Sequence, residues 1–331
     1  MTQGDVGILK EAGDEAGSIR SLRIAVAGLG LIGGGVAVKL LKGETSHRLC
    51  AALVRDVSKD RGEFFRDVLI TDDIASLLAT SPDIVIDALP DGAAGRKLIK
   101  AALEAGVSVV SANKQGVAGA LGEFHRLAEK TGALFYYSAS VGGETPMVET
   151  IRKYSDHARI QSVSAILNGT VNYILTALAQ GKSFAAAVTE AQDAGFAEPD
   201  PTADLSGADA VAKISILSFE AFGAEIDILS TAATALSPEM ASEIEASGGV
   251  WRQVSTVERG VDGDLTAAVR ILPIEESHYL HTVDNEENAL ILKLAAGAGD
   301  IVCKGRGAGQ APTVASLFND VTSIAAVRVK S

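Results

Sequence analysis

The chain has 331 residues, 47% of them hydrophobic, which is enough apolar material for two domains with separate cores. Its formal net charge is -13 without a cluster of Lys and Arg, which argues against a nucleic acid or an anionic membrane as partner. Neither a secretory signal nor an apolar run long enough to span a bilayer is visible. We therefore expect a cytoplasmic protein with a flexible N-terminus at residues 1–20.

The first motif follows a short apolar run. Residues 22–27 are typical of a buried parallel strand, and the sequence GLGLIG follows at 28–33. A helical stretch at 34–42 and a second strand at 49–54 complete a unit of about 30 residues. This context predicts a turn that binds the pyrophosphate of a dinucleotide.

Each glycine of that turn has a separate task. Gly28 permits the tight turn, Gly30 lets the backbone approach a pyrophosphate, and Gly33 allows close packing of the helix. The candidate cofactor contacts in this unit are Gly28, Gly30, Leu31, Ile32, Gly33 and, at the end of the second strand, Arg55.

The alternation of strand and helix continues through the next hundred residues. Strands are predicted at 83–89, 107–110 and 133–137, with helices at 93–105 and 118–130 between them. This pattern predicts an α/β fold with a doubly wound parallel (Rossmann) sheet over residues 21–140. Ligands of such sheets bind beyond the carboxyl ends of the strands.

Three residues stand directly after predicted strands. Pro90 and Asn113 are candidate cofactor contacts, and Lys114 can contact either the cofactor or a substrate carboxylate. A solvated loop lysine is the alternative interpretation of Lys114.

The regular alternation of strand and helix ends after about residue 145. Strands are expected at 160–167, 266–272 and 289–294, and helices at 170–180 and 184–194, which together indicate a mixed α+β domain over residues 141–304. A glycine-rich turn that contains Gly305 and Gly309 precedes a helix from Pro312 to about Ala326. We expect this segment, 305–331, to return to the cofactor domain, with Gly305 and Gly309 near the cofactor.

A cluster of charge marks the start of an otherwise apolar helix. Glu198, Asp204 and Asp209 precede or open this helix, and Lys213 lies four residues after Asp209, on the same face. Most such pairs are exposed and contribute only about 0.2–0.5 kcal/mol. Apolar neighbours on every side instead favour a buried pair that exchanges protons in a cleft.

Other catalytic groups are less evident. Cys50 and Cys303 lie far apart and outside any CxxC pair, so they indicate neither a disulfide framework nor a structural zinc site. The five histidines form no HxH or HxxxH pair, which gives no sign of a transition-metal site.

Taken together, these motifs resemble those of the homoserine dehydrogenases. The resemblance covers residues 22–327 and rests on six segments: GLGLIG at 28–33, SANK at 111–114, SVGG at 140–143, NGTVNYIL at 168–175, GFAEPDP at 195–201 with the helix through Lys213, and GRGAG at 305–309. It implies hydride transfer between NAD(P) and an amino-acid substrate, interconverting L-homoserine and L-aspartate 4-semialdehyde. It also implies a homodimer that meets through the second domain.

The resemblance also implies roles for the charged residues. Lys213 corresponds to the lysine at the reacting oxygen and Asp209 to its carboxylate partner. Glu198 and Asp204 correspond to acids around the substrate's ammonium group, and Lys114 to a lysine near substrate and nicotinamide. A zwitterionic substrate needs groups of both signs, and this cluster supplies them.

Two departures from the family pattern concern the segment that helps bind a monovalent cation through backbone carbonyls. Ser138 stands where many relatives have Glu, and Glu144 follows two glycines. The sequence therefore does not decide whether a cation binds here or how the substrate fits against this segment. We also expect no regulatory ACT domain, and hence no feedback through one, which is compatible with a catabolic role.

The choice between NADP and NAD is also open. Arg55 can contact a 2′-phosphate, whereas the adjacent Asp56 can hold a 2′-hydroxyl, and Lys59 nearby tilts the balance slightly toward NADP.

Two alternatives remain at this point. The first is a dehydrogenase of the same architecture that acts on another hydroxy amino acid, which the changes at Ser138 and Glu144 motivate. The second is a cofactor-binding protein without catalysis, which the presence of both Asp209 and Lys213 disfavours.

Overall fold

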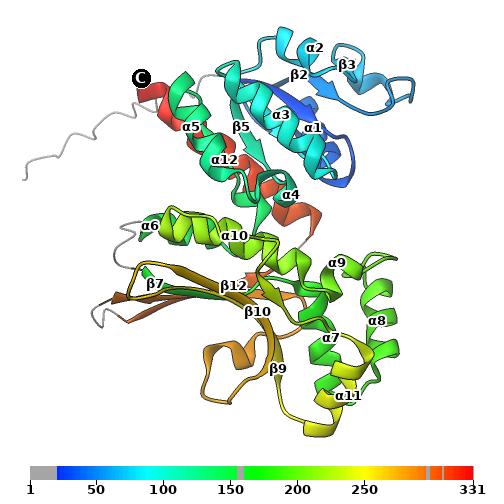
Figure 1. Cartoon of the computed structure of the whole chain (residues 1–331). Helices are drawn as coiled ribbons and strands as arrows, with labels where there is room; N and C mark the ends of the chain where they lie inside the picture. Colours follow the sequence, from blue (N-terminus) through cyan, green and yellow to red (C-terminus); the bar gives the residue numbers. More distant parts are fainter. Residues whose placement is uncertain (1–20, 155–159, 296–298, 308, 331) are drawn as a thin grey trace, which may run out of the picture.

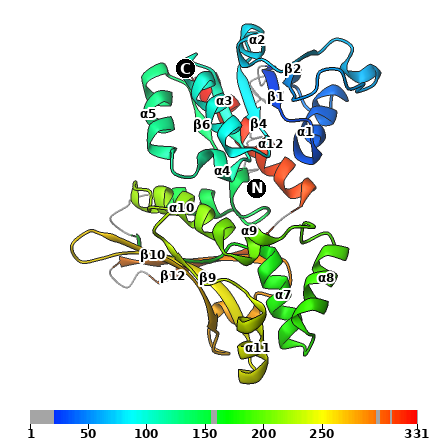
Figure 2. The same cartoon turned by 45° about the vertical axis from the view of Figure 1, so that its right-hand side comes forward.

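The computed structural model describes residues 21–154, 160–295, 299–307 and 309–330, so the predicted flexible segment 1–20 lies outside the described residues. Two six-stranded sheets, here called sheet A and sheet B, form the frameworks of two halves of the molecule (Figure 1). Helix α10 lies between the halves in both views (Figures 1 and 2).

Sheet A is parallel throughout, which confirms the predicted doubly wound fold. Its strand order is β3-β2-β1-β4-β5-β6, so the order reverses between β1 and β4, where such sheets bind ligands. The strands are β1 (Arg23–Ala27), β2 (Arg48–Leu53), β3 (Leu69–Thr71), β4 (Ile84–Asp87), β5 (Ser108–Ser111) and β6 (Phe135–Tyr136).

Helices cover both faces of sheet A because its strands are apolar on both sides. Side chains of β1 such as Ile24 and Val26 pack with α1 and α12, whereas Ala25 and Ala27 face the side of α2, α3 and α5. The helices of this half are α1 (Leu31–Leu41), α2 (Ile74–Ala79), α3 (Gly92–Glu104), α4 (Lys114–Val117), α5 (Leu121–Thr131) and α12 (Gln310–Lys330).

Helix α1 begins earlier than the sequence predicts. The expected start was residue 34, but the helix starts at Leu31, directly after Gly30 in extended conformation. Two glycines of its first turns, Gly33 and Gly35, have neighbours packed close to them. A Cβ at Gly35, for example, would lie 3.1 Å from atoms of both Gln310 and Val314 on α12.

The helix predicted at 118–130 is present as α5 but begins at Leu121, and a separate short helix, α4, precedes the predicted range. Ala118 leaves the helical conformation and Gly119 has a φ of +75°, so the short α4 ends before α5 begins at Leu121. This break lets the chain turn toward the second half, where Glu225 accepts hydrogen bonds from the backbone N–H groups of Leu121 and Gly122.

Sheet B contains both parallel and antiparallel pairs, and with its helices it confirms the α+β character predicted for the second part of the chain. Its order is β12-β11-β7-β9-β10-β8, and every pair is antiparallel except β8 with β10. Strand β9, near the centre of this sheet, was not predicted from the sequence. The strands are β7 (Ile160–Ile166), β8 (Ala232–Ala233), β9 (Trp251–Arg259), β10 (Leu265–Pro273), β11 (Glu287–Leu294) and β12 (Asp300–Arg306).

One face of sheet B carries the helices. Val163, Val257, Val269 and Leu290 pack in one core with apolar residues of α6 and α10. The helices of this half are α6 (Met147–Lys153), α7 (Gly169–Ala179), α8 (Phe184–Asp193), α9 (Thr202–Leu205), α10 (Ala208–Phe222) and α11 (Pro238–Ser247), and 3-10 turns occur at Glu63–Phe65, Ser138–Ser140 and Tyr279–Thr282.

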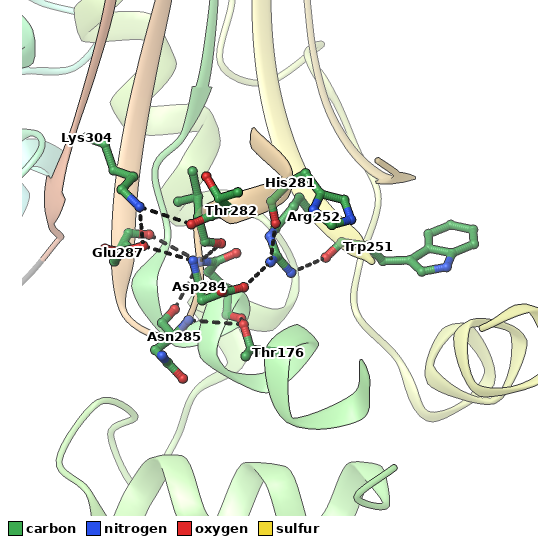
Figure 3. Close-up of polar contacts among 11 residues, drawn as sticks. Thr176, Trp251, Arg252, His281, Thr282, Asp284, Asn285, Glu287 and Lys304 are labelled. Carbon is green, nitrogen blue, oxygen red and sulfur yellow. Dashed lines mark hydrogen bonds and ion pairs between the residues drawn. The ribbon is translucent and has the colours of Figure 1, made fainter. Parts of the chain in front are cut away.

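The loop between β10 and β11 is fastened to sheet B by a buried arginine. Arg252 of β9 is 1% exposed, donates hydrogen bonds to the carbonyls of Trp251 and His281, and forms an ion pair with Asp284 (Figure 3). Burial lowers the pKa of Arg252, while Asp284 opposes that shift. The same loop also contacts α7, since the hydroxyl of Thr176 on that helix accepts a hydrogen bond from the N–H of Asn285.

Candidate active site

A single buried carboxylate joins the two halves of the molecule. Asp209 lies in the first turn of α10, and its side chain is 2% exposed. One of its oxygens lies 2.8 Å from Nζ of Lys213, one turn along the same helix, and the other forms an ion pair with Lys114 of the cofactor half. The interpretation of Asp209 and Lys213 as an exposed pair is therefore wrong.

Two neighbours orient the ammonium group of Lys213. Besides its contact with Asp209, Nζ donates a hydrogen bond of 2.8 Å to the backbone carbonyl of Leu167, at the end of β7. A lysine ammonium has three donors, so one remains for a ligand. The side chain is 15% exposed, so it is not fully shielded from solvent.

A second carboxylate lies beside the first. The amide of Asn168 donates hydrogen bonds to Asp204 of α9, at 2.8 Å, and to Asp209, at 3.2 Å. Glu198 is exposed on the loop before α9, and its negative charge contributes to raising the pKa of Lys114. The structure thus brings Lys114, Asp204, Asp209 and Lys213 together and places Glu198 at the edge of the same group.

Lys114 is placed by the corner after β5. Asn113, its neighbour, caps α4 by accepting a hydrogen bond from the N–H of Gly116 and donates to the carbonyl of Asp91 after β4. Beneath this corner lies Asp87, fully buried, which accepts a hydrogen bond from Ser111. Burial raises the pKa of Asp87 to about 6, although the hydrogen bonds that Asp87 accepts, including the one from Ser111, oppose that shift.

The charges in the cluster change one another's proton affinity. Burial works to raise the pKa of Asp209, but the ammonium groups of Lys213 and Lys114 outweigh it and hold that pKa below its ordinary value. Burial works to lower the pKa of Lys114, and Asp209 reverses this, so that pKa is raised. The pKa of Asp204 is raised, first by burial and then by the charge of Asp209. Asp209 therefore stays ionised, whereas Asp204 is the acid that gains a proton more readily.

The glycine turn has the geometry that a dinucleotide requires. Gly28 has a φ of +86°, and a Cβ there would lie 2.6 Å from the carbonyl oxygen of Ala88. A Cβ on Gly33 would lie 1.8 Å from the carbonyl oxygen of Gly28. Around Gly30, by contrast, the described residues leave the space of a side chain free.

The N-terminus of α1 completes this turn. Gly30 is its N-cap residue, and no described side chain caps the helix, so the N–H groups of its first turn face outward. A pyrophosphate fits here, since a helix N-terminus attracts anions and the free space at Gly30 permits close approach. Leu31 and Ile32 form this first turn, and Leu31 is exposed.

The other expected cofactor residues lie on elements outside this turn. Pro90 and Arg55 are exposed beyond the carboxyl ends of β4 and β2. Gly309 directly precedes α12, whose first residue, Gln310, donates a hydrogen bond of 2.8 Å to the carbonyl of Leu31. Gly305 lies within β12 rather than in a turn, and a Cβ there would contact Thr145.

Sequence reasoning assigned no role to Asn168 or to the carbonyl of Leu167. Asn168 is 2% exposed and caps α7 through its side-chain oxygen, 2.9 Å from the N–H of Val171. An Asn before a helical stretch is an N-cap signal, but that signal predicts the cap and not the contacts with two acids. A backbone carbonyl leaves no trace in the sequence at all.

The fold and this site together define a class of protein. A dinucleotide turn at the end of β1 and a lysine with a carboxylate partner, placed across the interface of the halves, are the parts of an NAD(P)-dependent dehydrogenase. Comparison with known protein families agrees. Residues 146–322 match the homoserine dehydrogenase model, and residues 28–138 match the model of the homoserine dehydrogenase NAD-binding domain. The chain belongs to the homoserine dehydrogenase family.

Individual relatives show the extent of the similarity. A homoserine dehydrogenase of Mycobacterium tuberculosis is 34% identical, with 95% of this chain and 74% of the relative covered. One from Bacillus subtilis is 30% identical, with coverage of 92% and 73%. The crystal structure of a homoserine dehydrogenase from Thiobacillus denitrificans superposes with a TM-score of 0.82 at 28% identity, covering 94% of this chain and 75% of that one.

The described residues contain no group of three or more His, Cys, Asp or Glu side chains that could hold a metal ion. Within the same ranges, no helix combines the length and the apolar character needed to cross a membrane.

The glycine turn gives a first testable prediction. Gly30→Val is expected to fold normally, because the side chain enters free space, but to weaken NADP binding at least about a hundredfold by blocking the pyrophosphate. The dissociation constant, from quenching of protein fluorescence by NADPH, measures this. Gly33→Ala is the matched contrast, since its Cβ meets the backbone and should lower the melting temperature as well. Normal NADP binding by Gly30→Val would show that the phosphates bind elsewhere.

Proposed function

We propose that this protein interconverts L-homoserine and L-aspartate 4-semialdehyde by hydride transfer with NAD(P), where its two halves meet. The observation that carries the proposal is the ion-paired group of Asp209, Lys213 and Lys114, which lies at the carboxyl edge of sheet A on the side of the dinucleotide turn. Membership of the family supports the same reaction.

The proposed mechanism gives Lys213 the proton transfer. Bound NAD(P) supplies the hydride acceptor or donor, and oxidation of an alcohol also requires that the hydroxyl lose a proton. Nζ of Lys213 has one donor position left after Leu167 and Asp209. In its neutral form Lys213 takes the hydroxyl proton as hydride leaves the terminal carbon of homoserine. In the reverse direction its ammonium group polarises the aldehyde and returns the proton.

The acids are proposed to hold the substrate's amino group. Asp204 and Glu198 flank the lysines, and a substrate ammonium between them would replace solvent as their partner. Lys114 faces the same space and would position the substrate close to the nicotinamide. A hydroxy acid without an amino group would offer no ammonium group to the half-buried Asp204, which disfavours such substrates.

Initial rates of cofactor reduction at 340 nm test this proposal. The wild-type protein should reduce NADP with L-homoserine at alkaline pH, and Lys213→Ala should lower kcat by about a thousandfold or more while cofactor binding is unchanged. A much higher kcat/KM for a substituted homoserine would replace the substrate assignment. Cofactor binding without turnover of any hydroxy amino acid would support a binding protein without catalysis.

NADP is proposed as the preferred cofactor. Asp56, the acid that would hold a 2′-hydroxyl, is engaged locally: its side chain accepts hydrogen bonds from the N–H and the hydroxyl of Ser58, at 2.9 and 2.6 Å. Arg55 is exposed beyond β2, and Lys59 and Arg61 follow it. Three cations around this corner favour a 2′-phosphate.

The variant Arg55→Ala tests that preference. We expect the KM for NADP to rise about tenfold and the KM for NAD to change less than twofold, because only the former has the additional phosphate. Steady-state kinetics with both cofactors give the ratio. Arg66→Ala, another exposed arginine of the same region, should leave both values unchanged. Equal effects of Arg55→Ala on both cofactors would contradict this role.

A monovalent cation is proposed for a cavity of about 160 Å³ between residues 138–149 and α12. Ser138 and Thr145 are among the residues that line it, and their buried hydroxyl oxygens have no hydrogen-bond partner in the described structure. Glu144 and Glu149 supply negative charge to the same cavity. Oxygen atoms of this kind suit K⁺ or Na⁺, so the rate assay includes both salts against a choline control.

A homodimer through sheet B is proposed as the assembly. The face of sheet B opposite α10 carries a small apolar cluster with Ile166, Val254 and Ile291, and no α-helix of the described ranges packs on it. Leu272 and Val302 are 39% and 40% exposed on β10 and β12. An exposed apolar sheet face favours association with a second copy.

Charge on that face should separate the subunits. The double variant Leu272→Asp with Val302→Asp is expected to sediment with the mass of one chain, whereas the wild-type protein sediments with that of two. Phe64→Asp is the control, because it introduces charge at an exposed apolar residue of the cofactor half. A dimer that persists in the double variant would place the interface elsewhere.

A further inference from the structure

The corner between β7 and α7 contacts three charged side chains of the second half, Asp204, Asp209 and Lys213. Asn168 donates its amide hydrogens to Asp204 and Asp209, and the carbonyl of the preceding Leu167 receives Nζ of Lys213. Two consecutive residues therefore position three charged side chains. Asn168 is only 2% exposed, so these contacts are shielded from water.

The orientation of the Asn168 amide follows from the structure. Its oxygen accepts a hydrogen bond of 2.9 Å from the N–H of Val171, which only the oxygen can do. The nitrogen must then face the two carboxylates, which only accept hydrogen bonds when ionised. A flipped amide would lose the cap and set its oxygen against two negative charges, so a single orientation is stable.

We propose that Asn168 is a positioning residue for catalysis, an amide clamp that keeps Asp204 and Asp209 ionised, apart and correctly directed at the substrate and at Lys213. The inference rests on the proposed function for its kinetic consequences, but the clamp itself is a property of the folded site. Asp209 has two lysines to offset its charge, whereas Asp204 has the clamp as its one hydrogen-bonded side-chain partner in the described structure.

The pH dependence follows from the environment of Asp204. From α10 it faces Asp209 and Lys213, from α4 Lys114, and from the β7–α7 corner Asn168. Burial and then the charge of Asp209 raise its pKa, and the hydrogen bond from Asn168 is the largest of the effects that lower it. Loss of the clamp therefore raises the pKa of Asp204 further. The carboxylate then forms only at higher pH. In the reduction direction, where Lys213 acts as an ammonium group, the acidic limb of kcat/KM for the aldehyde moves upward with it.

Asn168→Ser separates the clamp from the helix cap. Serine is an equally good N-cap residue but is too short to donate to both acids, so α7 keeps its cap and the clamp is lost. We expect kcat/KM for homoserine to fall about tenfold to a hundredfold, as for the loss of hydrogen bonds to charged groups. The acidic limb for the aldehyde should move to higher pH, with the dissociation constant for NADP and the melting temperature close to those of the wild-type protein.

Asn168→Asp is the second variant, since it keeps shape and cap but sets a third carboxylate between the other two. Its fall in kcat/KM and its shift of the acidic limb should exceed those of Asn168→Ser. Ser183→Ala is the control: it removes the cap of α8, outside the site, and should lower the melting temperature without changing the pH profile. A wild-type kcat/KM and profile in Asn168→Ser would reduce Asn168 to a helix cap and overturn the proposal.

A titration without turnover separates this inference from the proposed function. Carboxyl ¹³C resonances of aspartate, with the signal of Asp204 assigned through Asp204→Asn, report its protonation in the holoenzyme whatever the substrate is. The midpoint should be higher in Asn168→Ser than in the wild-type protein. An unchanged midpoint would refute the clamp even if homoserine is oxidised. A shifted midpoint in a protein that does not oxidise homoserine would support the clamp and refute the substrate.

Discussion

The shared carboxylate of Asp209 is the interaction on which the site depends. A fully buried carboxylate would ordinarily take up a proton, and here two ammonium groups keep it charged. Lys213 comes from the same helix, whereas Lys114 comes from the opposite half of the molecule. Removal of either lysine would leave the buried charge of Asp209 only half compensated. Because Lys114 belongs to the cofactor half, its ion pair with Asp209 also links the two halves.

The helix that carries Asp209 is held at both ends. Near its C-terminus Glu220 pairs with Arg152 of α6 through two hydrogen bonds, and beyond that end Glu225 binds the N-terminus of α5 in the cofactor half. At its start, Asn168 and Lys114 contact the first turn. An element fixed at both ends keeps Lys213 in a constant position relative to sheet A, which is the kind of preorganisation that a reacting group needs.

The cofactor half was the easier one to predict because its signals are local. Strand, glycine turn and helix follow one another within about 30 residues, and each glycine has its own steric reason. The errors concern helix starts: α1 begins at Leu31 rather than at residue 34, and the helix predicted from 118 begins only at Leu121, because Gly119 has a positive φ. In the second half β9 was missed, because its polar residues Arg252, Gln253 and Ser255 are buried and disguise a central strand.

The sequence alone determined the doubly wound sheet and the four-residue spacing that sets Asp209 and Lys213 on one face of a helix, since both follow from short-range periodicity. Its motifs also indicated the family. Only the tertiary structure decided that Lys114 reaches the same carboxylate, that Asn168 holds two acids, and that a backbone carbonyl orients Lys213. These contacts join residues 36 to 95 positions apart, and such pairings depend on how α4, α7 and α10 pack rather than on any local pattern.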